Sequence, residues 1–199
     1  MPTDKAALIL ASTSPYRRAL LERLRLPFST EAPGVEESGE AGEAPGPRAL
    51  RLALAKAEAV AARRPGAAVI GSDQVAECQG RVLGKPHTAE AACAQLAAAS
   101  GTTVLFHSAV AVVHADHVTR ATHTDLTRVR FRRLGAAEIE RYVALDQPLD
   151  CAGSFRSEGL GIALIEAIET ADPTALVGLP LIWLAGALAR AGFSPLEAR

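Results

Sequence analysis

The short segment 12–18 brings together groups that could bind a polyphosphate. Ser12 follows an apolar run of strand type, and Pro15 suits the first turn of a helix that carries Arg17 and Arg18. Hydroxyl groups, free helix N–H groups and guanidiniums that converge at one point can bind phosphate. The same residues also fit a capped helix with two solvated arginines, and this segment alone does not decide between the two interpretations.

A second set of residues could supply acid–base and metal chemistry. Asp73 directly follows an apolar run of strand type, where a carboxylate points into the crevice of an open α/β sheet or simply caps a turn. Glu36 and Glu37 belong to an acidic loop, and Lys56 and Lys85 provide cations. Carboxylates would hold a hard divalent cation, while lysines neutralise phosphates. The chain lacks both common glycine-rich phosphate loops, which excludes P-loop and Rossmann enzymes.

Apolar periodicity and turn residues predict the elements that position these groups. Strands are expected over residues 7–11, 26–31, 67–71, 75–78, 81–83, 102–114, 118–131 and 162–169. Helices are expected over 15–25, 47–63, 88–101, 136–145 and 176–191, with loops over 32–46 and 148–161. Strands and helices alternate first, and a long hairpin with its turn at 115–117 follows. This order predicts a mixed α/β fold with two lobes around a cleft.

Composition limits the class of protein. A chain of 199 residues with a net charge of −1 suits one globular unit over 1–199, without a global preference for nucleic acid or anionic membranes. Three cysteines without metal-ligand spacing favour a reducing, cytoplasmic setting. The apolar stretch Leu176–Ala189 is interrupted by Pro180 and is shorter than a membrane span of about 20 residues.

One basic run lies in the second half of the chain. Arg128, Arg130 and Arg132 alternate with Val129 and Phe131. This alternation is typical of a half-buried strand with a charged outer face, and it favours that interpretation over a nucleic-acid site.

Taken together, seven segments in matching order resemble the Maf family of nucleoside triphosphate pyrophosphatases, over essentially the whole chain. These segments are Leu8–Arg18 (LILASTSPYRR), Val35–Glu37 (VEE), Leu54–Ala57 (LAKA), Ile70–Gln74 (IGSDQ), Gly84–Pro86 (GKP), Asp150–Gly159 (DCAGSFRSEG) and Val177–Pro180 (VGLP). The resemblance implies a two-lobed, mixed-sheet α/β fold of the Maf and inosine-triphosphatase-like kind, with a central cleft.

The resemblance also implies a reaction and its residues. Water attacks the α-phosphorus of a nucleoside triphosphate and releases pyrophosphate. Asp73 matches the proton acceptor, and the sequence leaves open whether it acts as a base or holds Mg²⁺ or Mn²⁺. Glu36 matches the acidic residue on the metal side. The positions that match phosphate binding are Ser12, Arg17, Arg18, Lys56 and Lys85, of which the two lysines are also expected to stabilise the transition state.

Three further positions bear on the base. The family branch that acts on dTTP and UTP typically has other residues where this chain has Tyr16, Gln74 and Glu158. This set resembles the branch that acts on 7-methyl-GTP. A tyrosine ring can stack on the cationic 7-methylguanine base, and a carboxylate can accept hydrogen bonds from its N–H groups. Tyr16 also fits an ordinary packing residue.

The expected function is therefore hydrolysis of 7-methyl-GTP to 7-methyl-GMP and pyrophosphate, with a divalent cation. The alternatives are a dTTP/UTP pyrophosphatase of the same family and a nucleotide-binding regulator of cell division. The expected partner is a nucleotide substrate, without nucleic acid or membrane, and a homodimer is the candidate assembly.

Overall fold

The computed structural model describes residues 6–114 and 120–197. Its strands are Leu8–Ala11 (β1), Ser29–Thr30 (β2), Ala68–Cys78 (β3), Arg81–Leu83 (β4), Thr103–His114 (β5), Arg120–Phe131 (β6) and Ile165–Glu169 (β7). Its helices are Pro15–Glu22 (α1), Pro45–Ala61 (α2), Ala89–Ala99 (α3), Ala136–Asp146 (α4) and Leu181–Arg190 (α5). Short 3₁₀ turns cover Ala152–Ser154 (η1), Leu160–Leu164 (η2) and Ala175–Val177 (η3).

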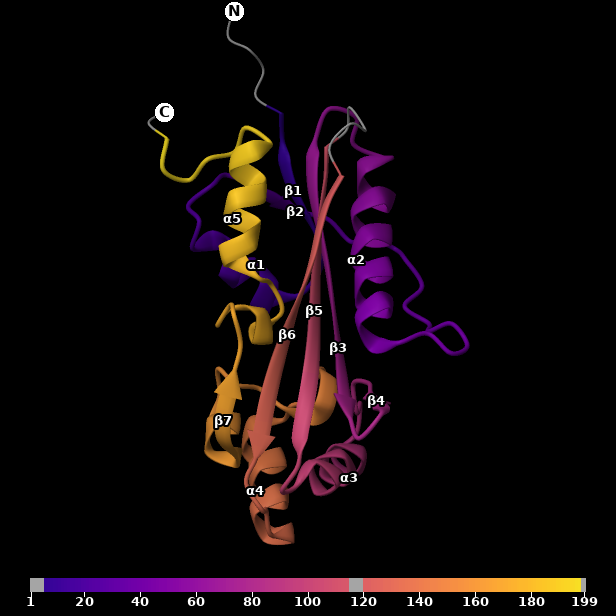
Figure 1. The fold of residues 1–199 in the computed structure, drawn as a ribbon, viewed down its shortest axis with the longest axis vertical. Coiled ribbons are helices and arrows are strands. Elements are labelled where there is room, and N and C mark those ends of the chain that lie inside the picture. The colour runs from indigo at the N-terminus through magenta and orange to yellow at the C-terminus, as the bar shows by residue number, and fades with distance from the viewer. Residues whose placement is uncertain (1–5, 115–119, 198–199) are drawn as a thin grey trace, which may run out of the picture.

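A single mixed sheet runs the length of the molecule (Figure 1). Its strand order is β2-β1-β3-β5-β6-β7, with β4 paired to β3. The short strand β1 is parallel to β2 and β3, and the other pairings are antiparallel. The predicted mixed α/β fold is confirmed, and so is the long hairpin β5–β6, whose predicted turn at 115–117 lies outside the described residues.

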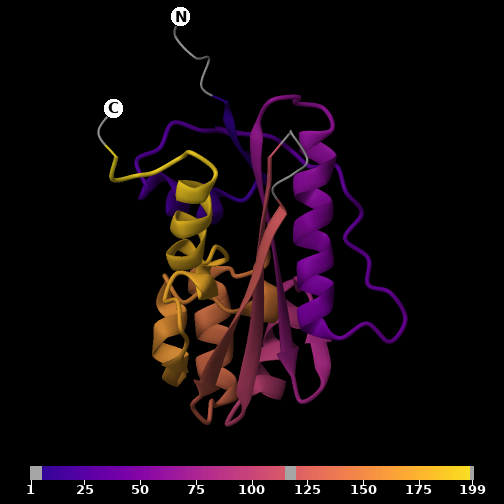
Figure 2. The same cartoon turned by 45° about the horizontal axis from the view of Figure 1, so that its top comes forward.

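The helices divide into two groups along this sheet, which gives the two predicted lobes. In the upper lobe, α1 and α5 cover one face of the sheet and α2 covers the other, whereas α3 and α4 lie around its lower end (Figures 1 and 2). Strand alternation explains this layering, since Leu10 and Ile70 pack toward α1 and α5 while Ile9 and Val69 pack toward α2. A separate apolar cluster around Phe106 fills the lower lobe.

Several of the predicted boundaries are wrong. The strand expected over 162–169 covers only Ile165–Glu169, because Leu160–Leu164 forms a 3₁₀ turn, and the strand expected over 26–31 covers only Ser29–Thr30. The run at 67–71 does not end before the polar residues, because β5 pairs with β3 at every position from Ala68 to Cys78. Asp73 therefore lies in the middle of a strand instead of at its end. The last helix begins at Leu181 and not at 176, because Gly178 has a φ of 118° and Pro180 precedes the first helical residue.

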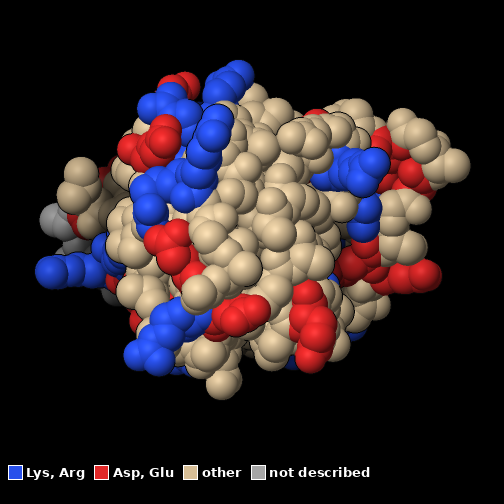
Figure 3. All heavy atoms as spheres, turned by 90° about the horizontal axis from the view of Figure 1, so that it is seen from below, with Lys and Arg blue, Asp and Glu red and all other residues tan. Residues whose placement is uncertain are grey.

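The basic run lies where the alternation predicts. Val129 and Phe131 are buried, while Arg128 and Arg130 are exposed. Arg130 forms an ion pair with a glutamate of β7. From below, acidic and basic side chains alternate around the rim of the molecule and do not form a field of one sign (Figure 3).

Helix α2 approaches β3 most closely at Gly71. A Cβ atom at this position would lie 2.1 Å from the carbonyl oxygen of Ala53 and 2.7 Å from the amide nitrogen of Ala57. Both atoms belong to the backbone of α2, so they cannot move aside as the end of a flexible side chain could. Glycine is therefore required here by packing, and this contact sets how closely α2 lies over the sheet.

We expect Gly71→Ala to lower the free energy of unfolding by about 3 kcal/mol, the upper part of the range for an overpacked core, because α2 must shift as a unit. Urea denaturation of the two proteins measures this difference. Gly84→Ala is the matched control, since a Cβ there meets nothing within 4 Å. Equal stability of the Gly71 and Gly84 variants would contradict the packing argument.

No helix in the described part of the chain combines the length and the apolar character that a bilayer crossing needs.

Candidate active site

A cleft of about 660 Å³ opens at an unpaired stretch of β3. Strand β1 pairs with β3 only as far as Gly71, and β4 pairs with it only from Ala76 onward. The edge of β3 is therefore free between them. Asp73 and Gln74 both line the cleft, although neighbouring side chains of a strand point to opposite faces of the sheet. The cleft thus receives side chains from both faces.

On the α2 face, an ion-pair triad occupies the cleft wall. The Lys56 Nζ donates to Asp73 Oδ1 at 2.6 Å and lies 2.6 Å from Glu37 Oε1. The side chains of Lys56 and Asp73 are only 4% and 9% exposed, whereas that of Glu37 is 53% exposed. Burial acts to raise the pKa of Glu37, but the hydrogen bond and the charge of Lys56 outweigh it, so this pKa lies below its usual range. The Glu37 carboxylate is therefore ionised near neutral pH.

The structure brings Glu37, not Glu36, to this triad. Glu36 is exposed, accepts a hydrogen bond from the Ser38 hydroxyl at 3.1 Å, and does not line the cleft. Neighbouring side chains of an extended loop point in different directions, so only one of the two glutamates can reach Lys56. A role for Glu36 in binding the metal stays a prediction, and the position of Glu36 outside the cleft lining does not favour it.

The β1–α1 junction has the predicted cap and one cleft-facing arginine. The Ser14 hydroxyl accepts from the Arg17 amide at 3.4 Å, and Ser12 Oγ accepts from the Ser14 amide at 3.1 Å. The Arg17 Nε donates to the Gly178 carbonyl at 3.1 Å. Burial lowers the pKa of the Arg17 guanidinium, and the charge of Asp73 opposes that effect. Ser12 and Arg17 thus line the cleft with their orientations fixed.

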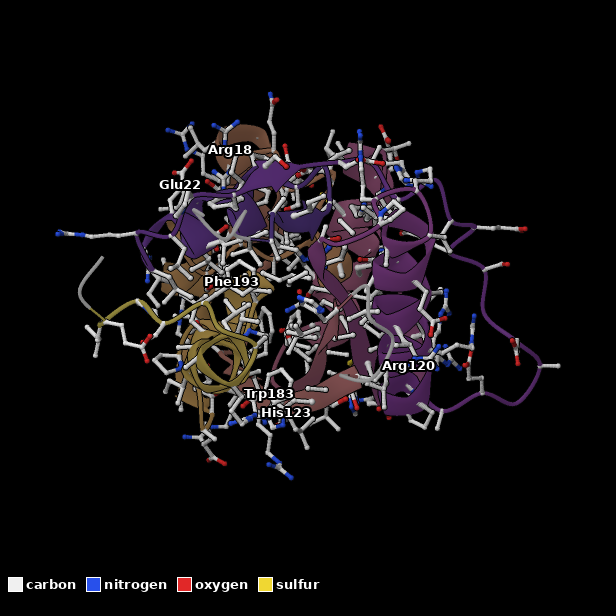
Figure 4. The ribbon with its side chains drawn as sticks, turned by 90° about the horizontal axis from the view of Figure 1, so that it is seen from above. Arg18, Glu22, Arg120, His123, Trp183 and Phe193 are labelled. Carbon is white, nitrogen blue, oxygen red and sulfur yellow. The ribbon has the colours of Figure 1, made fainter. Side chains whose placement is uncertain are left out.

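Arg18 lies outside the cleft lining. Its Nε donates to Glu22 Oε1 at 3.1 Å, and the Arg18 side chain is 63% exposed. The pair lies at the periphery of the molecule when it is seen from above (Figure 4). Arg18 follows Arg17 by about 100° around the helix, and this turn directs its side chain to solvent. Arg18 as a phosphate-binding residue stays a prediction, and the structure places it outside the cleft lining.

On the opposite face of the sheet, Gln74 is bound to the segment that precedes α5. Its Nε2 donates to the hydroxyl of Ser108 at 2.7 Å and lies 3.1 and 3.0 Å from the carbonyls of Ala175 and Leu176. All these contacts use the amide nitrogen of Gln74. The carbonyl oxygen of the side chain is the atom left to face a ligand in the cleft.

The segment Asp150–Gly159 closes this side of the cleft. Tyr16, Glu158 and Cys151 all line it. A hydrogen bond from Arg156 acts to lower the pKa of Tyr16, but burial and nearby negative charge raise it, and the net pKa lies above its usual value. The Tyr16 hydroxyl therefore stays protonated. Burial raises the pKa of Cys151 to about 12, so this thiol is not a nucleophile.

Lys85 follows β4 and reaches the cleft from the lower lobe, where its side chain is exposed. Its charge acts with that of Lys56 to lower the pKa of Glu37, which places both lysines near the same carboxylate. The predicted cations Arg17, Lys56 and Lys85 therefore converge on one cleft.

The carboxylates of Asp73 and Glu37 are the oxygen donors that could hold a divalent cation in the cleft. Nowhere in residues 6–114 and 120–197 do three His, Cys, Asp or Glu side chains come close enough together to hold a metal ion by themselves. Asp73 and Glu37 nevertheless both lie 2.6 Å from one ammonium group, so their oxygens converge on a single cation position. Mg²⁺ is usually bound by one or two carboxylates together with substrate phosphates and waters, and this pair fits that mode.

Sequence reasoning missed two cleft-side arginines. Arg156 contacts Tyr16 and Asp146, and Arg48 lines the cleft itself. Arg156 belongs to a segment without periodicity, so its direction could not be inferred. Arg48 had a usable signal, because Arg48, Leu52 and Lys56 follow one another at intervals of four residues on α2, and residues four apart are neighbours on a helix surface.

Two of three comparisons with known proteins bear on this site. A family model of Maf-like proteins matches residues 7–191. The chain is 59% identical over 186 residues to the 7-methyl-GTP pyrophosphatase of Xanthomonas oryzae pv. oryzae, covering 94% of this chain and 97% of that protein. It is 52% identical over 196 residues to the protein of the same name from Bordetella pertussis, covering 98% of both. Among solved structures, a nucleoside-triphosphatase/dITP/XTP pyrophosphatase from Mycobacterium abscessus matches at 17% identity with a TM-score of 0.43, covering 94% of this chain and 97% of that one, which is too distant to bear on the site.

Proposed function

Because the chain belongs to the Maf family, we propose that it is a nucleoside triphosphate pyrophosphatase that hydrolyses 7-methyl-GTP to 7-methyl-GMP and pyrophosphate. The observation that carries the proposal is the cleft at the free edge of β3, where Asp73, Lys56 and Arg17 meet. Near full-length relatives that carry this name support the choice of substrate. The proposed unit is the single domain 1–199. Its three unpaired cysteines fit a reducing compartment, and we place it in the cytoplasm.

The two faces of β3 suggest how the substrate lies. Asp73, Lys56 and Glu37 line the cleft from the α2 face, and we assign this half to the triphosphate. Gln74 and Tyr16 line the other half, which we assign to the base. The ribose and the α-phosphate then cross the edge of the strand, next to Asp73.

The proposed reaction is a displacement at the α-phosphorus. The oxygen of a water molecule bonds to this phosphorus, the bond to the bridging oxygen of the β-phosphate breaks, and the pyrophosphate leaves with the electron pair. Asp73 receives the water's proton, because its carboxylate belongs to the stretch of β3 whose edge is free at the cleft. Lys56 and Lys85 stabilise the negative charge that develops on the phosphate oxygens, and Arg17 orients them.

Asp73 and Glu37 are the residues that would hold a divalent cation, and we propose Mg²⁺ or Mn²⁺. Bound there, the cation would supply Lewis-acid polarisation of the phosphate and a more acidic water. Lys56 Nζ lies between the two carboxylates, 2.6 Å from an oxygen of each. Its flexible four-carbon stem allows the ammonium to turn toward a phosphate oxygen when the carboxylates are otherwise bound.

The proposed base subsite matches a cationic purine. The ring of Tyr16 offers a stacking face, the carboxylate of Glu158 offers an anionic acceptor, and Gln74 offers its carbonyl oxygen. An aromatic face can stack on a positive charge, and the two side-chain oxygens accept hydrogen bonds from N–H donors. The 7-methylguanine base has a positively charged ring, an N1–H and an amino group. Thymine and uracil present carbonyl oxygens at the corresponding edge and lack the positive charge.

The experiment that tests this assignment measures pyrophosphate release from 7-methyl-GTP, dTTP and UTP by the wild type and two variants. We expect Glu158→Gln to shift the kcat/KM ratio toward the pyrimidine nucleotides by about ten- to a hundredfold, because it removes one charge-assisted hydrogen bond. Tyr16→Ala should shift the same ratio through loss of stacking.

Arg18→Ala is the matched control, because Arg18 lies on the same helix as Tyr16 but outside the cleft lining. Its kcat/KM ratio should equal that of the wild type. An unchanged ratio in both Glu158→Gln and Tyr16→Ala would show that the base is recognised elsewhere. Faster wild-type turnover of dTTP or UTP than of 7-methyl-GTP would contradict the proposed substrate.

A further inference from the structure

A largely buried ion pair lies behind the half of the cleft that we assign to the base. The Nη2 atom of Arg156 lies 2.5 Å from Oδ1 of Asp146, the last residue of α4. The side chains of Arg156 and Asp146 are 28% and 8% exposed, and neither residue lines the cleft, although Phe155, Ser157 and Glu158 do. Buried ion pairs contribute little net stability, but they can fix the arrangement of the groups around them.

The guanidinium of Arg156 also contacts the hydroxyl of Tyr16. This hydrogen bond is the largest influence on the pKa of Arg156, which it raises. Because a guanidinium is planar and its N–H groups have fixed directions, the bond to Asp146 sets the direction of the donor that reaches Tyr16. Tyr16 belongs to the first turn of α1 in the upper lobe, and Asp146 ends α4 in the lower lobe (Figure 1). Arg156 thus connects the two helices on this side of the cleft.

The same ion pair lies beneath the turn that carries Glu158. A Cβ atom at Gly159 would lie 2.8 Å from Arg156 Nε and 2.8 Å from each carboxylate oxygen of Asp146, so the backbone of this turn packs directly on the pair. The amide of Gly159 donates to the Arg156 carbonyl at 3.3 Å, and the amide of Arg156 donates to the Tyr142 hydroxyl at 3.1 Å. Both ends of the turn are therefore held, and Glu158 lies between them.

We propose that the ion pair of Arg156 and Asp146 positions the two residues that recognise the base, Tyr16 and Glu158, and thereby sets the preference for a cationic purine. This inference rests on the proposed function, which assigns the base to this half of the cleft. Arg156 and Asp146 are positioning residues, because neither lines the cleft. A stacking ring and a carboxylate that are held in place before the base binds lose less conformational entropy when it does.

Loss of the pair should act on binding of the base and not on the chemistry at the α-phosphorus. We expect Arg156→Met to raise KM for 7-methyl-GTP about tenfold, the scale of one lost stacking contact, and to leave kcat nearly unchanged. The nucleotides dTTP and UTP lack the positive charge and should be affected less, so the kcat/KM ratio shifts toward them. Arg156→Lys keeps the charge without the planar set of donors, and its KM should lie between those of the wild type and Arg156→Met.

Arg132 offers a matched control. Its Nη2 atom lies 3.2 Å from Oε1 of Glu138, which belongs to the first turn of α4, and neither residue lines the cleft. Arg132→Met therefore also removes an ion pair with α4, but at the end of the helix away from Asp146. Its KM and its kcat/KM ratio should equal those of the wild type.

A spectroscopic measurement separates positioning from a general loss of structure. The chain contains two tyrosines, of which Tyr16 contacts the side chain of Arg156 and Tyr142 contacts its backbone amide. In protein labelled with 3-fluorotyrosine, ¹⁹F NMR therefore gives one resonance for each contact, and Tyr16→Phe assigns them. We expect Arg156→Met to shift the Tyr16 resonance and to leave the Tyr142 resonance in place.

Three results would overturn this inference. They are an unchanged KM for 7-methyl-GTP or an unchanged Tyr16 resonance in Arg156→Met, an equal loss of kcat/KM for all three nucleotides, and the same rise of KM in Arg132→Met. If Arg156→Met does not fold, the double variant Arg156→Met with Asp146→Asn decides in the same terms, because it leaves no carboxylate unpaired. Faster wild-type turnover of dTTP or UTP would remove the proposed substrate, whereas a Tyr16 resonance and a base preference that still change in Arg156→Met would leave the positioning role intact.

Discussion

Asp73→Asn lowers kcat for pyrophosphate release by at least about 100-fold, the scale expected when a general base is removed, and leaves the fold unchanged. Asparagine has nearly the same volume as aspartate and can keep one acceptor toward Lys56. Lys56 also keeps its contact with Glu37 at 2.6 Å, so the buried ammonium is not left unpaired. The substitution therefore removes the negative charge and little else.

Steady-state kinetics with 7-methyl-GTP, combined with thermal unfolding, separates chemistry from stability in this variant. Asp73→Glu serves as the second variant, because it keeps the carboxylate but moves it by one methylene, and its kcat should lie between those of the wild type and Asp73→Asn. A variant Asp73→Asn that retains most of the wild-type kcat would show that another group accepts the proton.

Removal of divalent cations with EDTA lowers turnover by about 10³-fold, and added Mg²⁺ restores it. Asp73 and Glu37 both line the cleft, and carboxylates there would repel a polyanionic substrate. A cation between these carboxylates and the phosphates reverses that repulsion, and metal ions supply several kcal/mol of such stabilisation. Each 1.36 kcal/mol corresponds to a factor of ten in rate, which gives the expected loss.

Glu37→Gln distinguishes the two glutamates in this experiment. We expect it to raise the Mg²⁺ concentration needed for half-maximal activity, whereas Glu36→Gln, with its side chain outside the cleft, should leave that concentration unchanged. Full turnover in EDTA would exclude a role for metal. A shift caused by Glu36→Gln alone would mean that the loop rearranges when the substrate binds.

The sequence was most informative where function depends on local structure. The strand, the cap and the helix around Pro15 follow from neighbouring residues, and the structure has them as predicted. Helical spacing allows a further prediction, because residues four apart lie side by side on the surface of a helix. The same reasoning along α2 relates Arg48 to Lys56.

Long-range pairing accounts for what the sequence could not predict. Asp73 lies in mid-strand because β5, some thirty residues later, pairs with all of β3. The amide nitrogen of Gln74 is held by carbonyls about a hundred residues later in the chain. The choice of Glu37 over Glu36 depends on the path of a loop without periodicity. None of these contacts has a signature in the neighbouring residues.

The continuity of the central strands constrains how a substrate can enter. Strands β3, β5 and β6 each pass through both lobes without interruption, and β5 pairs along the full length of β3. The sheet therefore resists bending, because a hinge between the lobes would have to bend three long strands together. The connections outside the sheet, 31–44 and 150–159, are therefore the segments that can open and close the cleft. Substrate exchange should thus be limited by loop motion, with the distance between the lobes held constant through the catalytic cycle.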